Sequence, residues 1–247
     1  MITSQANPRL KLVRRLSARR ARERLGLFVC EGEDLVAAAL DAGLVPVEAL
    51  VDAERPALAD RLSGVEPVEP KLLAAVSELA HPPRVIAVFR RADLPRLDLE
   101  SAPPAGLALW RVADPGNLGT LVRSADSLGP AFVCLSPGCA DPTGPKALRA
   151  SMGATFRVPL GDFDAAPRPW IALRPGEAPP LWDVELPPAA TFLLGAERSG
   201  LPADLLERCD ASATIPQADG AESLNVGAAG AIALYERRRR AARSCRG

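Results

Sequence analysis

Polar side chains that packing does not demand are concentrated in three short segments of the second half of the chain. The first reads Asp114-Pro-Gly-Asn-Leu-Gly-Thr-Leu-Val-Arg123. Asp-Pro-Gly favours a turn, and Asn117 can cap the helix that follows it. Apolar residues at helical spacing supply the buried face of that helix, which leaves Asn117 and Arg123 available for chemistry. Taken alone, a capping asparagine and a surface arginine explain this segment better than a functional site does.

The second segment joins an apolar run to a carboxylate. It reads Phe192-Leu-Leu-Gly195-Ala-Glu197-Arg-Ser-Gly200-Leu201, and Gly195 permits close approach of the backbone to a ligand. Glu197 follows a predicted strand and could bind a ligand or cap a helix. The residue types alone leave both interpretations open.

The third segment runs from Ile215 through Ser223-Leu224-Asn225 into the small residues Gly-Ala-Ala-Gly-Ala at 227–231. Ser223 or Asn225 could serve as a helix N-cap. The small residues predict that another backbone packs closely on this helix, which is a structural role. Each of the three segments follows a predicted strand, and ligands of open α/β sheets bind outside the carboxyl ends of the strands. These segments are therefore where we expect a ligand site.

Alternating strands and helices must position the three segments. In the first part of the chain we expect an N-terminal helix, strands at 27–30, 45–51 and 85–89, and helices at 34–42, 57–62 and 70–79. In the second part we expect strands at 107–112, 132–135, 170–173, 191–194 and 213–215, and helices at 118–128, 145–151, 202–208 and 224–243. Residues 92–106 lack periodicity and are rich in proline, which indicates a linker. The pattern predicts an α/β protein with one domain over residues 1–91 and a second over residues 107–247.

The two ends of the chain are basic although the net charge is zero. Residues 1–24 hold eight basic residues against one acidic residue, and residues 236–247 hold six against one. Clustered arginines suit phosphate groups, because a guanidinium can bind two oxygens at once. A solvated helix face would explain a single cluster equally well, but two basic ends on an acidic body favour a polyanion partner.

Composition disfavours several other classes of protein. No apolar run approaches the roughly 20 residues of a membrane span, and the N-terminus lacks a signal-peptide pattern, so we expect a cytoplasmic protein with no membrane partner. Five scattered cysteines and a single histidine, His81, cannot easily form a zinc site, so we expect no metal and reduced thiols. A nucleotide-binding oxidoreductase fits poorly because no G-x-G-x-x-G follows an opening strand, and residues 138–146 have the wrong spacing for a P-loop.

Together the three segments resemble motifs 1, 2 and 3 of the SpoU/TrmH family of RNA ribose 2′-O-methyltransferases, within the SPOUT superfamily. The matching stretches are DPGNLGTLVRSAD, LLGAERSGL and IPQADGAESLNVGAAGAIALYE, in that order and at family-like spacing. The stretch from Asp141 to Ala154 is similar to another one typical of the family, and NPRLKLVRRL and HPPRVIAVF resemble its RNA-binding leader domain. One departure is Ala196, where many relatives carry a polar residue.

The resemblance implies an enzyme that methylates a ribose 2′-hydroxyl of structured RNA, either ribosomal or transfer RNA, with S-adenosylmethionine. It implies an N-terminal L30e-like RNA-binding domain and a C-terminal SPOUT domain with a deep trefoil knot. It also implies a homodimer whose active site lies near the subunit boundary. Two other interpretations stay open. One is a non-enzymatic RNA-binding protein on the same fold, and the other is a base methyltransferase of another SPOUT branch, which Ser-Leu-Asn at 223–225 disfavours.

The roles that the resemblance implies fall on three sets of residues. Reaction and substrate orientation would involve Arg123, Asn117, Glu197, Ser223 and Asn225. Backbone groups would bind the cofactor near Leu194, Gly195, Ile215, Pro216 and Leu224. The RNA would be bound by Arg9, Lys11, Arg14, Arg15, Arg19, Arg22 and Arg149. Since a guanidinium stays protonated up to about pH 12, we expect Arg123 to hold a phosphate and stabilise negative charge rather than act as a base.

Overall fold

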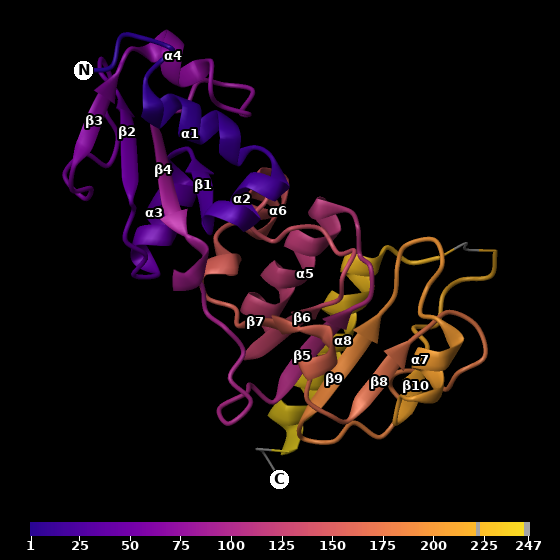
Figure 1. Ribbon diagram of the computed structural model, residues 1–247. Helices are drawn as coiled ribbons and strands as arrows, with labels where there is room; N and C mark the ends of the chain where they lie inside the picture. The colour runs from indigo at the N-terminus through magenta and orange to yellow at the C-terminus, as the bar shows by residue number, and fades with distance from the viewer. Residues whose placement is uncertain (221–222, 245–247) are drawn as a thin grey trace. The chain divides into compact units, whose positions relative to one another are not determined.

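The chain forms two compact units in a computed structural model that describes residues 1–220 and 223–244 (Figure 1). Unit 1 consists of Met1–Leu94 together with Asp141–Phe156. Unit 2 consists of Pro95–Ala140 together with the chain from Arg157 onward. The α/β class expected from the sequence is confirmed, and each unit is built around its own sheet.

Unit 1 holds a four-stranded sheet in the order β1-β4-β2-β3. Its strands are β1 (Leu27–Glu31), β2 (Glu48–Asp52), β3 (Val65–Val68) and β4 (Val85–Arg90). The helices of its first segment are α1 (Pro8–Leu16), α2 (Arg19–Leu25), α3 (Glu33–Asp41) and α4 (Pro70–Ala74). Alternate residues of β4 face opposite cores: Ile86 and Val88 lie in the core that includes Leu10 of α1, and Ala87 and Phe89 lie in the core that includes Val36 of α3. The sheet is therefore covered on both faces.

Asp141–Phe156 packs in unit 1, although it lies between two strands of unit 2 in the sequence. It contains α6 (Pro145–Ser151) and a short 3₁₀ helix at Ala154–Phe156. Leu148 and Phe156 belong to the same buried core as Phe28, and the Phe28 and Phe156 rings stack with centroids 6.0 Å apart. The structure therefore differs from the expected continuous second domain over 107–247. The sequence predicts a helix at 145–151, but it does not say in which core that helix packs.

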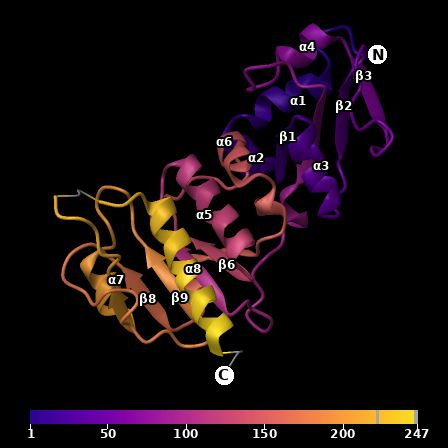
Figure 2. The same cartoon turned by 180° about the vertical axis from the view of Figure 1, so that it is seen from behind.

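Unit 2 is built on a six-stranded, all-parallel sheet in the order β10-β8-β9-β5-β6-β7. The strands are β5 (Ala105–Leu109), β6 (Ala131–Leu135), β7 (Leu160–Asp162), β8 (Trp170–Leu173), β9 (Ala190–Leu194) and β10 (Ala211–Ala213). Helices α5 (Pro115–Leu128) and α8 (Val226–Ser244) cover one face, and the shorter α7 (Ala203–Glu207) lies toward the other (Figures 1 and 2). Central strands β5 and β9 are buried throughout, which explains their continuous apolar sequences.

Small residues let α5 and α8 pack closely. A Cβ added at Gly230 of α8 would come within 2.2 Å of Leu121 Cδ2, and one added at Gly227 would come within 3.1 Å of Thr120 Cγ2. The close neighbour that the small residues predict is therefore α5 of the same chain.

Several details of the expected secondary structure differ from the structure. Residues 57–62 form turns instead of a helix, and Leu58 has a φ of 56°, which a right-handed helix does not allow. Strands β3 and β7 were not expected, because one contains Pro67 and the other is three residues long and contains Gly161; both are edge strands. The expected linker over 92–106 ends earlier, since β5 begins at Ala105.

None of the described helices is both long and apolar enough to cross a membrane.

Candidate active site

The three polar segments meet at the carboxyl edge of the unit 2 sheet. Leu109 at the end of β5 pairs with Leu194 at the end of β9, so the loops that follow the two strands start side by side. The loop after β5 enters α5, and the segment after β10 leads to the start of α8 beside it. Parallel strands thus bring together residues that are about a hundred positions apart in sequence.

A chain of side-chain hydrogen bonds joins one residue from each segment. Asn117 Nδ2 donates to Glu197 Oε1 at 3.0 Å, and Asn225 Nδ2 donates to Asn117 Oδ1 at 2.9 Å. Asn225 Oδ1 in turn accepts from the Gly227 amide at 2.8 Å, at the first turn of α8. Since each amide uses its donor toward one neighbour and its acceptor toward the other, the orientation of both asparagines is fixed.

The helix cap expected at Asn117 belongs to Asp114 instead. The Asp114 carboxylate accepts from the Asn117 amide at 2.7 Å, and Asp114 is the N-cap of α5. The Asn117 side chain is therefore free to connect Glu197 with Asn225. Glu197 Oε1 also accepts from the Asp114 amide, at 3.4 Å, which ties the second segment to the turn of the first.

Gly195 is required by the fold of its own loop. The loop turns back on itself through paired hydrogen bonds between Ala196 and Gly200. A Cβ added at Gly195 would lie 2.1 Å from the carbonyl carbon of Gly200. The close backbone contact at Gly195, which the sequence predicts for a ligand, is therefore made by Gly200 of the same loop. This turn places Glu197 near Asn117.

A cavity of about 470 Å³ opens beside this network. Four of the five expected cofactor residues line it: Leu194, Gly195, Ile215 and Leu224. Pro216 does not line it, although its neighbours Ile215 and Gln217 do. Glu197, Ser223 and Asn225 also face the cavity. Its volume and its mixture of apolar walls with a few polar groups suit a ligand of the size and chemistry of S-adenosylmethionine, with an apolar wall for a base and polar groups for a ribose and an amino acid.

Some cavity residues were not singled out from the sequence. Leu173 ends β8, Arg174 and Pro175 follow it, and Arg198 follows Glu197. Arg-Pro-Gly after β8 indicates only a turn. The turn after β8 lies in the site because β8 pairs with β9 in the sheet. The sequence does not reveal this strand order.

Arg123 does not line the cavity. It is exposed on α5, six residues after Asn117, which corresponds to about 9 Å along the helix axis and a different helix face. Within one chain, Arg123 therefore stands apart from the hydrogen-bonded asparagines.

The basic residues of unit 1 do not all face solvent. Lys11, Arg14 and Arg15 are exposed on α1, whereas Arg9 forms ion pairs with Glu48 and Glu66 at 3.0 and 2.8 Å. Arg19, on α2, is exposed and pairs with Glu23, while Arg149 of α6 is partly buried.

Arg22 requires a correction, since its side chain is only 5% exposed. Its guanidinium donates to Asp141 Oδ2 at 2.8 Å and to the carbonyls of Leu16 and Ser17. Arg91 donates to the other carboxylate oxygen of Asp141. Arg22 is therefore part of a buried ion-pair network and does not present its charge to RNA.

The arginines at the end of α8 also have a structural role. Arg240 donates to the carbonyls of Val184 and Leu181, Arg238 donates to that of Gly129, and Arg237 donates to that of Pro188. Hydrogen bonds from Arg239 and Arg240 hold the pKa of Glu236 at about 2. These arginines therefore tie α8 to neighbouring loops, a structural role that the charge pattern does not predict, and their binding of a polyanion stays a prediction.

The described part of the chain contains no group of three His, Cys, Asp or Glu residues arranged to hold a metal ion. None of the described cysteines, Cys30, Cys134, Cys139 and Cys209, forms a disulfide. Burial raises the pKa of Cys134 to about 12 and that of Cys30 well above its ordinary value, so neither is a reactive thiolate.

Comparison with known proteins agrees with the site. Residues 104–235 match the SpoU rRNA methylase family, and residues 7–87 match the MRM3-like substrate-binding domain. An uncharacterized tRNA/rRNA methyltransferase of Synechocystis is 34% identical over 96% of this chain and 93% of its own length. The 23S rRNA (guanosine(2553)-2′-O)-methyltransferase RlmP of Bacillus subtilis is 31% identical, covering 96% and 98%. The structure of an AdoMet-bound rRNA methyltransferase from Sinorhizobium meliloti superposes with a TM-score of 0.85 at 29% identity, covering 97% of both chains.

The parallel sheet, its edge cavity and the matched motifs define an RNA methyltransferase. The chain belongs to the SpoU rRNA methylase family. The resemblance recognised in the three segments is thereby confirmed.

Proposed function

We propose that this protein methylates a ribose 2′-hydroxyl of ribosomal or transfer RNA with S-adenosylmethionine. The observation that carries the proposal is the hydrogen-bonded chain of Glu197, Asn117 and Asn225, in which Glu197 and Asn225 line the cavity and Asn117 joins them. Two kinds of relative support it: one is a 2′-O-methyltransferase of 23S rRNA, and another was solved with AdoMet bound. The bacterial relatives of similar length support the cytoplasm as the proposed location.

The residues that line the cavity would hold the cofactor. Backbone groups at Leu194, Gly195 and Ile215 offer donors and acceptors for an adenine, and Leu224 offers an apolar surface. When bound, S-adenosylmethionine supplies a methyl group on an electrophilic sulfonium. The contribution of the protein is then to hold the ribose oxygen in line, which can lower the barrier by several kcal/mol, on the order of 7–11 in the best intramolecular cases.

Asn117, Glu197 and Asn225 would orient the ribose. The chain of hydrogen bonds fixes both amides, so a ribose hydroxyl would meet a preset pattern of donors and acceptors. Ser223 would add a further hydroxyl at the cavity wall. Because these groups need not move when the substrate binds, little reorganisation is required.

Arg123 would act electrostatically on the reacting hydroxyl. As the hydroxyl passes its proton to solvent water, negative charge grows on the oxygen, and a guanidinium nearby would stabilise that charge. Arg123 is exposed and away from the cavity of its own chain, which supports a role in a site completed by a second copy.

We infer that the second copy packs on the outer face of α8. Ile232 and Tyr235 are 38% and 57% exposed there, one helical turn apart, while the opposite face of α8 is packed on α5. The family resemblance supports this homodimer.

The same resemblance supports a deep trefoil knot in unit 2 and an L30e-like fold for unit 1. The exposed Lys11, Arg14 and Arg15 of unit 1 would contact RNA phosphates.

Methyl transfer to RNA tests the proposal directly. Labelled S-adenosylmethionine is incubated with ribosomal and transfer RNA from a strain that lacks this gene, and the RNA is then digested for nucleoside mass spectrometry. A 2′-O-methylated nucleoside is the expected product. A labelled base with unmodified ribose would place the protein in another SPOUT branch, and binding of RNA without transfer would indicate a non-enzymatic role.

Arg123→Ala tests the role of the arginine in the same assay. The exposed side chain makes this change compatible with the fold, so we expect a lower kcat at an unchanged melting temperature. Equal labelling by the wild type and Arg123→Ala would remove Arg123 from the mechanism.

A further inference from the structure

Arg111 has an unusual backbone conformation next to the site. It follows β5 by two residues and has a φ of 53°, in the left-handed region that residues other than glycine seldom adopt. Met152 shares this conformation, but it ends helix α6, where a left-handed residue is common. At Arg111 the conformation lies at the carboxyl end of a central strand, where ligands of such sheets bind.

Neighbouring loops hold the backbone of this residue in place. The Arg111 amide donates to Ser136 Oγ at 2.9 Å, and the Ser136 amide donates to the Leu109 carbonyl at 3.0 Å. On the other side, the Trp110 amide donates to the Leu194 carbonyl at 2.8 Å. Glycine would allow the same turn with less strain. The presence of an arginine at this position therefore indicates a role for its side chain.

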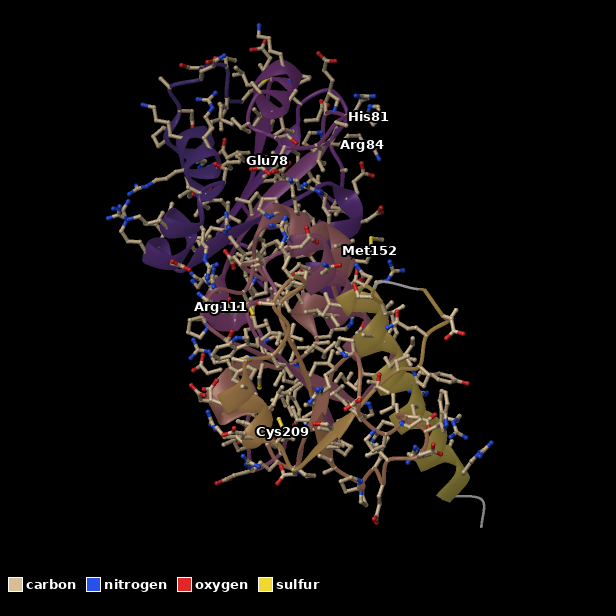
Figure 3. The ribbon with its side chains drawn as sticks, turned by 90° about the vertical axis from the view of Figure 1, so that its right-hand side faces the viewer. Glu78, His81, Arg84, Arg111, Met152 and Cys209 are labelled. Atoms are coloured by element: carbon tan, nitrogen blue, oxygen red, sulfur yellow. The ribbon has the colours of Figure 1, made fainter. Side chains whose placement is uncertain are left out.

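The Arg111 side chain is supported along its length but open at its end. A Cβ added at Gly138 would lie 3.5 Å from Arg111 Cγ and 3.3 Å from Arg111 Nε, so the stem runs over a residue that has no side chain. Arg111 is exposed, and no carboxylate of the described residues forms an ion pair with it. Figure 3 shows it on the side of unit 2 away from α8.

We infer that Arg111 binds a backbone phosphate of the substrate RNA where the strand passes the carboxyl edge of the sheet. An arginine fork matches the oxygens of a phosphate, and the substrate of this family is a polyanion. The cofactor is not the ligand, because Arg111 does not line the cavity. Arg111 precedes Asp114 by three positions, and Asp114 caps α5 and accepts from the Asn117 amide, so a phosphate held there is positioned relative to the ribose site.

The inference rests on RNA methylation as the reaction, and Arg111→Gly tests it. Glycine removes the charge and relieves the backbone, so the melting temperature should equal or exceed that of the wild type. With ribosomal and transfer RNA from the deletion strain, we expect the KM for RNA to rise about tenfold, with kcat within twofold and S-adenosylmethionine affinity unchanged. The slope of log affinity against log salt should fall by about one. Arg111→Lys should recover part of the lost affinity.

Met152→Gly is the matched control, because it relieves the same conformation at an exposed residue without removing a charge. It should leave the KM for RNA unchanged. An unchanged KM and salt slope in Arg111→Gly would overturn the inference, as would a fall in kcat alone or a lower melting temperature. Absence of methyl transfer by the wild type would instead count against the proposed function.

Discussion

Asn117 is the residue on which the three motif segments depend. Its amide group accepts from Asn225 and donates to Glu197, and no other described side chain bonds to both. The sequence indicates that Asn117 is polar where packing does not demand it, but it places the asparagine as a helix cap. The cap is Asp114, three residues earlier, and only the coordinates show how this frees Asn117 for the site.

We expect Asn117→Ala to lower kcat/KM for methyl transfer by roughly ten- to a hundredfold, because hydrogen bonds to charged groups contribute about 1.5–3 kcal/mol. Its melting temperature should change little, since Asp114 still caps α5. Steady-state methyl transfer and thermal unfolding measure the two effects. Ser127→Ala, an exposed change on the same helix, is the control. Wild-type kinetics in Asn117→Ala would show that the hydrogen-bonded chain has no part in the reaction.

Asp141 lies in the buried ion-pair network of unit 1. Burial alone would raise the pKa of its carboxyl, but the charge of Arg91 and hydrogen bonds from Thr143 and Arg22 outweigh it and lower the pKa. Because the folded-state pKa is the lower one, the contribution to stability is present above the unfolded pKa of about 3.9 and is lost as the pH falls through the folded value.

Asp141→Asn should therefore lower the free energy of unfolding at pH 7 by about 3–5 kcal/mol, since it leaves two arginines without their carboxylate. It should also flatten the loss of stability below about pH 4. Urea unfolding at several pH values measures both effects. Asp126→Asn breaks the exposed pair with Arg157 and should change stability by less than about 1 kcal/mol. If the two variants were equally stable, the buried network would not stabilise unit 1.

At the scale of elements, the strands buried on both faces were the most predictable. The predicted strand at 170–173 matches β8, and that at 191–194 lies within one residue of β9, because continuous apolar runs leave little choice. The strand at 213–215 was displaced, since β10 is a three-residue edge strand at Ala211–Ala213.

Helix α8 shows the limit of charge patterns. Its arginine run suggests a solvent-facing surface for phosphates, yet several of these side chains bind backbone carbonyls of adjacent loops.

The contact between α5 and α8 predicts the effect of a single methyl group. Gly230→Ala should lower the free energy of unfolding by about 1–3 kcal/mol, because the added Cβ would overlap Leu121. Alanine stabilises a helix by about 1 kcal/mol relative to glycine. The measured loss in free energy of unfolding is therefore the cost of crowding minus this gain. Leu121→Ala in the same chain should make Gly230→Ala less harmful. Additive effects in a double-mutant cycle on urea unfolding would contradict the contact.

At the scale of the whole molecule, the outer face of α8 predicts self-association. Tyr235→Arg should give a monomer by size-exclusion chromatography with light scattering, and it should lower methyl transfer by more than about tenfold, because a charge cannot be buried unpaired in an interface. Thermal unfolding at a concentration where both proteins are monomeric should be unchanged. Leu99→Arg, at another exposed apolar residue, is the control and should stay dimeric. A Tyr235→Arg dimer with full activity would move the interface elsewhere.

The return of Asp141–Phe156 to unit 1 has a consequence for the order of events during synthesis. The N-terminal core needs Leu148 and Phe156 beside Phe28, so it cannot close when residue 94 leaves the ribosome. At about 5–20 residues per second, translation of residues 95–156 takes roughly 3–12 s, during which Phe28 has Phe89 beside it but lacks Phe156. By then β5, α5 and β6 have also been made. Strands of the second sheet are therefore synthesised before the core of the first unit is complete, and cutting the gene at the apparent linker would leave that core without Leu148 and Phe156.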